Sequence, residues 1–86
     1  MKTIVIEDEK LAAERLEELI HEIDPSIEIS TKLTSVEQSI KYLKQNKPDL
    51  IFLDIQLEDG LSFSIFDKVD IDIPIIFTTA YDQYAI

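Results

Sequence analysis

Two apolar stretches of the sequence run directly into acidic side chains. Glu7 and Asp8 follow residues 3–6, and Asp54 follows residues 50–53. A carboxylate in such a place can start a turn, bind a metal ion or act as a nucleophile. Two carboxylates about 4 Å apart repel each other by about 4 kcal/mol at an effective dielectric constant of about 20, so acids that converge need a cation or raised pKa values. Ligand sets made only of oxygen atoms favour Mg²⁺.

The spacing of the apolar residues predicts the elements that position these acids. Short apolar or alternating stretches predict strands, and apolar residues that recur every three to four positions predict amphipathic helices. Strands are expected at residues 3–6, 27–30, 50–53 and 75–78, and helices at 10–23, 35–45 and 61–69, with the first turn of another helix at 81–86. Ser35 and Gln38 have the spacing of a capping box at the start of the second helix.

Candidate core residues follow from the same periodicity. The positions expected to face inward are Ala12, Leu16, Leu19, Ile20 and Ile23 on the first helix, Leu61, Ile65 and Phe66 on the third, and the rings of Phe63 and Phe77. His21 is expected on the solvent side of the first helix, and Glu58 and Asp59 are expected to be solvated loop residues. None of these last three is therefore assigned a part in the chemistry.

Strands that alternate with helices predict an α/β fold. Right-handed crossovers place the strands parallel in one sheet with helices on both faces, which gives a doubly wound parallel sheet of four strands. In such sheets ligands bind beyond the carboxyl ends of the strands, where the strand order reverses. The residues expected at this edge, after the first, third and fourth strands, are Glu7, Asp8, Asp54, Thr79 and Ala80.

These motifs resemble the receiver domains of two-component response regulators. The resemblance rests on the acidic pair after the first strand, the single Asp after the third and the Thr-Ala after the fourth, all in order. The loop DIQLEDGLSF, followed by FTTAYDQYAI, is most similar to receivers of the LytTR type, which usually precede a DNA-binding domain. The resemblance covers residues 1–86 and implies a single domain with the flavodoxin-like (CheY-like) receiver fold.

The resemblance also implies a role for six residues. Asp54 would accept a phosphoryl group, Thr79 would donate its hydroxyl to that group, and Ala80 would keep the entrance to the site open. The implied Mg²⁺ ligands are the carboxylates of Glu7, Asp8 and Asp54 and the backbone carbonyl of Gln56. Glu7 stands where the family more commonly has Asp. Phosphoryl transfer needs positioning and charge neutralisation more than covalent help, which this set would supply.

The implied partner is a histidine kinase, which would be the source of the phosphoryl group. The 18 acidic and 8 basic residues give a net charge of −10, which disfavours direct contact with nucleic acid because such contact depends on Lys and Arg. DNA binding would therefore belong to a separate output domain. No apolar run approaches the ~20 residues that cross a bilayer. Together with the absence of cysteine, this favours a cytoplasmic protein with no membrane partner.

Receivers normally continue into a fifth strand and helix, with a lysine that pairs with the phosphoryl group. We expect this chain to lack those elements, as a truncated receiver would. The strand at 75–78 would then present an unpaired apolar edge, and residues 81–86 would be free to exchange between copies. A homodimer or a domain-swapped oligomer is therefore expected.

Other interpretations remain open at this point. On their own, residues 7–9 would be acids that favour the start of a helix. A small Mg²⁺-dependent phosphatase of related topology would need a second acid close after the nucleophile, and Gln56 stands there, so we expect no turnover enzyme. A third alternative is an interaction or dimerisation fragment that is not phosphorylated.

Overall fold

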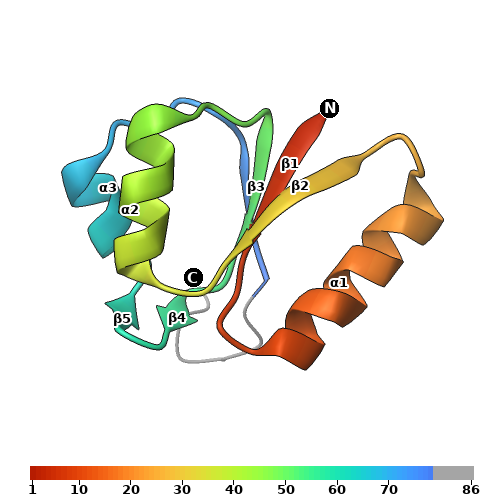
Figure 1. Ribbon diagram of the computed structural model, residues 1–86, viewed down its shortest axis with the longest axis horizontal. Coiled ribbons are helices and arrows are strands. Elements are labelled where there is room, and N and C mark those ends of the chain that lie inside the picture. Colours follow the sequence, from red (N-terminus) through yellow and green to blue (C-terminus); the bar gives the residue numbers. More distant parts are fainter. Residues whose placement is uncertain (79–86) are drawn as a thin grey trace.

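The computed structural model of the chain describes residues 1–78. Its elements, in order, are β1 (Lys2–Ile6), α1 (Lys10–Ile23), β2 (Glu28–Leu33), α2 (Val36–Gln45), β3 (Leu50–Leu53), β4 (Gln56–Leu57), β5 (Gly60–Leu61), α3 (Ser64–Lys68) and β6 (Ile75–Phe77). Helix α1 lies on one side of the central strands, and α2 and α3 lie together on the other (Figure 1). Within this part of the chain no helix has the length and apolar character that a membrane crossing requires.

Four strands form one parallel sheet in the order β2-β1-β3-β6, which confirms the predicted α/β fold. The strand order reverses at β1, because β2 pairs with one side of it and β3 with the other. The register places Ile6 opposite both Leu33 and Leu53, and Leu53 opposite Phe77. All four strands therefore end at the same level, and the residues after β1 and β3 emerge side by side.

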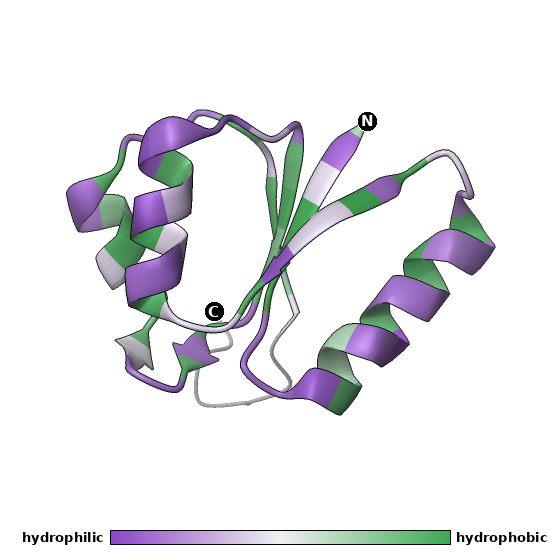
Figure 2. Ribbon diagram, in the orientation of Figure 1, coloured by the Kyte–Doolittle hydropathy of each residue, from purple (hydrophilic) through white to green (hydrophobic). Residues whose placement is uncertain are grey.

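The sheet is covered on both faces by two hydrophobic clusters. Alternation along β1 directs Ile4 and Ile6 into the cluster beneath α2 and α3, and Val5 into the cluster beneath α1. All three side chains are buried. Apolar residues are concentrated in the strands, whereas hydrophilic residues are frequent along the helices (Figure 2). Burial on both faces explains why residues 4–6 of β1 and all of β3 are uniformly apolar in the sequence.

Strand β2 is longer than predicted, because it continues to Leu33 instead of ending at residue 30. It is an edge strand, and alternate residues along it are exposed. Thr31 and Lys32 pair with Ile4 and Val5, so backbone pairing extends the strand through residues whose polar side chains gave no strand signal.

Helix α2 begins at its predicted cap. The Ser35 hydroxyl oxygen accepts a hydrogen bond from the Gln38 N–H at 3.0 Å. The Gln38 side chain does not return to Ser35; its Oε1 accepts from the Thr34 N–H at 2.9 Å. The second hydrogen bond of the capping box is thus made to Thr34, the residue before the cap, instead of Ser35. The two hydrogen bonds together hold the start of α2.

A short antiparallel hairpin, β4–β5, was not predicted. Gln56 pairs with Leu61 and Leu57 with Gly60. Gly60 has a φ of 145°, a backbone conformation that side chains with a Cβ rarely adopt. The hairpin takes up residues expected in the acidic loop and in the third helix, so α3 begins at Ser64 and not at residue 61.

Helix α1 buries a narrower stripe than expected. Ala13 and Ile20 are buried against the sheet, whereas Leu19 and Ile23 are exposed, Ile23 by 83%. Both exposed residues lie at the margin of the stripe that contacts β1 and β3. The prediction that they belong to the core was therefore wrong, and His21 is exposed as predicted.

The predictions for the segment around α3 were only partly right. Ile65 is fully buried, and Phe66 packs partly buried against the same cluster. Leu61, Phe63 and Phe77 are exposed, which contradicts the prediction that they face inward. The rings of Phe63 and Phe77 contact each other edge to face, with centroids 5.9 Å apart, so they pair with each other at the rim of the sheet and not in the core.

Candidate functional site

Three carboxylates meet at the carboxyl ends of β1 and β3. Glu7 and Asp8 follow β1, Asp54 follows β3, and each offers an oxygen that lies within 4.8 Å of the other two. The backbone ladder continues past the strands: the Asp54 N–H donates to the Ile6 carbonyl at 3.0 Å, and the Glu7 N–H donates to the Leu33 carbonyl at 2.9 Å. These backbone hydrogen bonds hold the three acids close together, as we expected from their positions at the ends of the strands.

The cluster carries more negative charge than its surroundings compensate. The pKa of Glu7 is raised from 4.5 to about 7, chiefly by burial and also by the charge of Asp54 and by the hydrogen bond and charge of Asp8. The hydrogen bond that the Glu9 N–H donates to Glu7 Oε2, at 3.0 Å, acts in the opposite direction but does not cancel these effects. A divalent cation would relieve the repulsion directly.

The donor set fits Mg²⁺. The three acids supply only hard oxygen ligands, all of them partly exposed to solvent, which leaves room for the waters that Mg²⁺ retains. Gln56 lies in β4, two residues after Asp54, and its side chain is exposed. The role predicted for its backbone carbonyl remains a prediction.

The two remaining predicted site residues, Thr79 and Ala80, lie outside residues 1–78. The backbone that leads to them is placed: the Thr78 N–H donates to the Leu53 carbonyl at 3.0 Å. Strand β6 therefore ends beside β3, next to Asp54. The contacts expected of Thr79 and Ala80 remain predictions.

A hollow of about 260 Å³ opens beside the acids. Its lining residues are Glu7, Asp8, Lys10, Ala13, Glu14, Lys32 and Thr34. Lys32 forms an ion pair with Glu17 of α1. The hollow gives solvent and small solutes access to Glu7 and Asp8.

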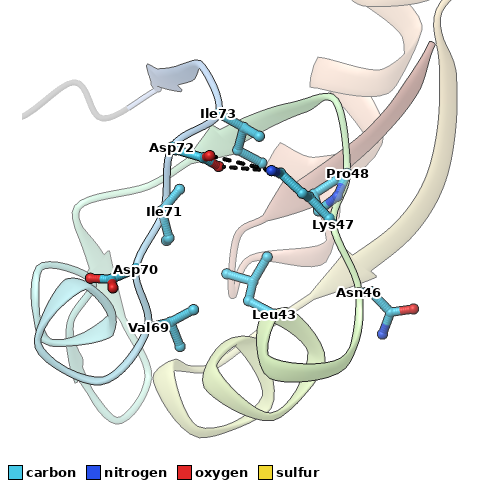
Figure 3. A pocket seen from close by; sticks show the side chains of 9 residues that line it. All are labelled: Leu43, Asn46, Lys47, Pro48, Val69, Asp70, Ile71, Asp72 and Ile73. Atoms are coloured by element: carbon cyan, nitrogen blue, oxygen red, sulfur yellow. Dashed lines mark hydrogen bonds and ion pairs between the residues drawn. The ribbon is translucent and has the colours of Figure 1, made fainter.

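A second cavity, of about 280 Å³, lies near the residues that precede β3 and β6, at the opposite end of these strands from the acids (Figure 3). It lies between the end of α2 and the segment before β6, and Lys47 pairs with Asp72 across it at 3.2 Å. Pro48 and Ile73, which precede β3 and β6, belong to its lining. The cavity is therefore separate from the acid cluster and has no part in the chemistry proposed below.

Sequence reasoning missed one residue near the site. Asp59, expected to be a solvated loop residue, accepts hydrogen bonds from the Val36 and Glu37 N–H groups at the start of α2. The Asp-Gly pair that ends the acidic loop, Asp59-Gly60, is a hairpin signal that could have located the turn. No local pattern could have shown that the turn contacts α2.

The fold and the acid cluster are those of a signalling receiver, and comparison with known proteins agrees. The model of the response regulator receiver domain family matches residues 3–86, and the chain belongs to this family. Receiver domains generally act as phosphoacceptors, bind Mg²⁺ in an acidic pocket and interact with histidine kinases. The resemblance stated from the motifs is thereby confirmed.

Individual relatives support the same assignment. The chain is 42% identical to the sensory transduction protein LytT of Bacillus anthracis and 36% identical to LytT of Enterococcus faecalis, over 89 residues in both cases. The alignments cover 100% of this chain and 36% of each relative, so the chain spans little more than a third of their length.

Solved structures share the fold. The response regulator PhyR from Brucella abortus matches with a TM-score of 0.78 and 28% identity, over 93% of this chain and 33% of that one. The receiver domain of PhyR from Erythrobacter litoralis matches with a TM-score of 0.76 and 31% identity, over 93% of this chain and 63% of that one.

The raised pKa of Glu7 predicts how stability depends on pH. Its ordinary value is 4.5 and its folded value about 7, so between these values the folded protein holds a proton that the unfolded chain has released. Stability without divalent cations should therefore fall as pH rises from about 4.5 to about 7. The melting temperature, measured in a chelator across this pH window, should decrease in the wild type, and Glu7→Gln should largely remove this decrease. An equal decrease in Glu7→Gln would assign it to other groups.

Proposed function

We propose that this chain is the phosphoacceptor module of a two-component system, a single receiver domain over residues 1–86. In this proposal Asp54 takes a phosphoryl group from a histidine kinase. The observation that carries the proposal is the convergence of Glu7, Asp8 and Asp54, with carboxylate oxygens within 4.8 Å of one another at the end of β1 and β3. A turn or the start of a helix needs only one acidic residue, so neither explains why three acids converge.

The chemistry follows from the position of each group. An Asp54 oxygen attacks the phosphorus atom, a P–O bond forms, and the P–N bond to the donor histidine breaks. The electron pair of the broken bond returns to the imidazole, which takes up a proton. Mg²⁺, held by Glu7, Asp8, Asp54 and the Gln56 carbonyl, would neutralise charge on the transferring oxygens. Asp54 stands at the end of a buried strand, which limits its movement relative to the other two acids.

Thr79 and Ala80 complete the proposed site. The Thr79 hydroxyl would donate a hydrogen bond to the bound phosphoryl group, and the small Ala80 side chain would leave the entrance open. Both follow β6 by a few residues, and the hydrogen bond from Thr78 to Leu53 supports their placement beside Asp54. The relatives extend well beyond the matched region, which supports a further proposal, that phosphorylation of this domain controls a DNA-binding output domain.

The two alternative functions have weaker support. A phosphatase would need a general acid shortly after the nucleophile, and the Gln56 amide cannot lose and regain a proton near neutral pH. An interaction module would not need three acids whose oxygens converge within 4.8 Å of one another. The expected homodimer or domain-swapped oligomer remains a prediction, supported by the exposed Ile76 and Phe77 side chains on β6.

Labelling by a small phosphodonor tests the proposal. Incubation with acetyl phosphate and Mg²⁺ should add one phosphoryl group per chain, measured by intact mass, and a chelator should prevent it. Asp8→Asn should slow labelling by about 10² to 10³ because it removes a charge that holds the cation. Glu9→Gln is the matched control, since Glu9 is exposed, adjacent and outside the cluster, and should label at the wild-type rate. Labelling that is independent of Mg²⁺ and of Asp8 would refute the proposed metal site.

A further inference from the structure

The tip of the β4–β5 hairpin is fastened to the start of α2. Asp59 Oδ1 accepts from the Val36 N–H at 2.7 Å, and Oδ2 accepts from the Glu37 N–H at 3.0 Å. Each carboxylate oxygen thus holds one of two consecutive amides in the first turn of the helix. These hydrogen bonds hold the pKa of the Asp59 carboxyl below its ordinary value, so it stays charged in that position.

Helix α2 therefore has two separate caps. Ser35, the residue before the helix, accepts from the Gln38 N–H. Asp59 comes from a distant part of the sequence and satisfies the two preceding amides. Without the Ser35 hydroxyl, Asp59 would still hold the hairpin on α2. Without the Asp59 carboxylate, the helix would keep its local cap, and the hairpin would keep only the hydrogen bond from the Thr34 hydroxyl to Glu58 Oε1 and the packing of Leu57. The two caps can thus be removed one at a time.

The same hairpin begins at the proposed metal site. Gln56, the first residue of β4, stands two positions after Asp54 and pairs with Leu61. The Ser62 N–H donates to the Ile55 carbonyl at 2.7 Å, which closes the base of the hairpin. The hairpin is thus a short hydrogen-bonded unit with Gln56 at its base, two residues after Asp54, and Asp59 at its tip.

We propose that Asp59 is a positioning residue of the metal centre: by holding the tip of the hairpin on α2, it fixes the direction of the Gln56 carbonyl at the base. Residues that orient metal ligands from outside contribute to affinity without touching the ion. The coupling is reciprocal, so a cation bound at the acids also tightens the contact between Asp59 and α2. The inference rests on the proposed function, because it requires the cation site at Glu7, Asp8 and Asp54.

Titration of the protein with MgCl₂ by calorimetry tests the inference. Asp59→Ala should weaken Mg²⁺ binding by about 10-fold, the lower end for residues that orient metal ligands. Ser35→Ala removes the other cap of the same helix; it should lower the melting temperature similarly and leave Mg²⁺ affinity at the wild-type value. Glu58→Gln removes one charge from the same hairpin but keeps an oxygen that can accept from the Thr34 hydroxyl, so it should also bind as wild type does. Asp59→Asn, which can still accept one hydrogen bond, should recover part of the affinity and serves if Asp59→Ala fails to fold.

Amide hydrogen exchange gives a second readout. Mg²⁺ should slow exchange of the Val36 and Glu37 amides in the wild type, and this slowing should disappear in Asp59→Ala and be reduced in Asp59→Asn. Equal Mg²⁺ affinity in the Asp59 and Ser35 variants, with wild-type binding that depends on Asp8, would overturn the inference and leave the proposed function standing. A wild type that binds no Mg²⁺ would overturn both.

Discussion

Replacing Asp54 by asparagine is expected to abolish phosphoryl transfer from acetyl phosphate and to leave the fold intact. An amide oxygen is a poor nucleophile and cannot form the acyl phosphate, so the loss should be complete and not partial. The hydrogen bond from the Asp54 N–H to the Ile6 carbonyl involves only backbone atoms and is retained in the variant. Intact mass after incubation with Mg²⁺ and acetyl phosphate measures the labelled fraction.

The same substitution at the other end of β3 provides the control. Asp49 precedes the strand, and its carboxylate accepts from the Lys2 N–H at 2.7 Å, far from the acid cluster. Asp49→Asn changes the charge of the chain equally and should label at the wild-type rate. If Asp54→Asn were labelled as fast as the wild type, the acceptor would be another residue.

Replacing Ile65 by alanine is expected to have the largest effect on stability. Ile65 has 0% of its side chain exposed and packs in the cluster beneath α2 and α3. Truncation of a buried isoleucine destabilises by about 2–5 kcal/mol. At about 0.05–0.15 kcal/mol per residue, a domain of this size has only about 4–13 kcal/mol in total. The melting temperature, measured by circular dichroism, should fall on the order of 10–25 °C.

An exposed isoleucine makes the matched control. Ile23, the last residue of α1, is 83% exposed, so Ile23→Ala removes the same atoms from a position that buries little. Its effect should be within about 0.5 kcal/mol. Similar losses of stability in both variants would mean that burial at Ile65 does not determine its contribution.

The parts of the site that were predictable depend on strong local patterns. Residues 4–6 of β1 and all of β3 lie between covered faces of the sheet, so these stretches are apolar and end sharply at Glu7 and Asp54. Parallel strands bring such ends to one edge, and the order reversal at β1 makes Glu7, Asp8 and Asp54 neighbours. Ser35 was identified because a capping residue acts within its own turn of helix.

The parts that were missed depend on contacts between distant residues. Strands β4 and β5 are two residues long, too short to show a period, and Asp59 acts on amides that precede it by more than twenty positions. Ile23 and Phe63 are apolar residues left at the surface, which composition cannot separate from core residues. Whether such an apolar side chain is buried depends on where its helix or loop ends relative to the neighbouring elements. The spacing of apolar residues along a helix does not show this.

The position of the acids also bears on how the chain folds. Glu7 and Asp54 are brought together by the pairing of β1 with β3, and the crossover between them contains β2 and both α1 and α2. Closing so long a loop is slow, and the acids can bind a shared cation only after it closes. A cation held by all three carboxylates would therefore mainly slow unfolding. It would accelerate folding only if β1 and β3 already pair in the transition state. A cation at this site would therefore also slow the separation of β1 from β3.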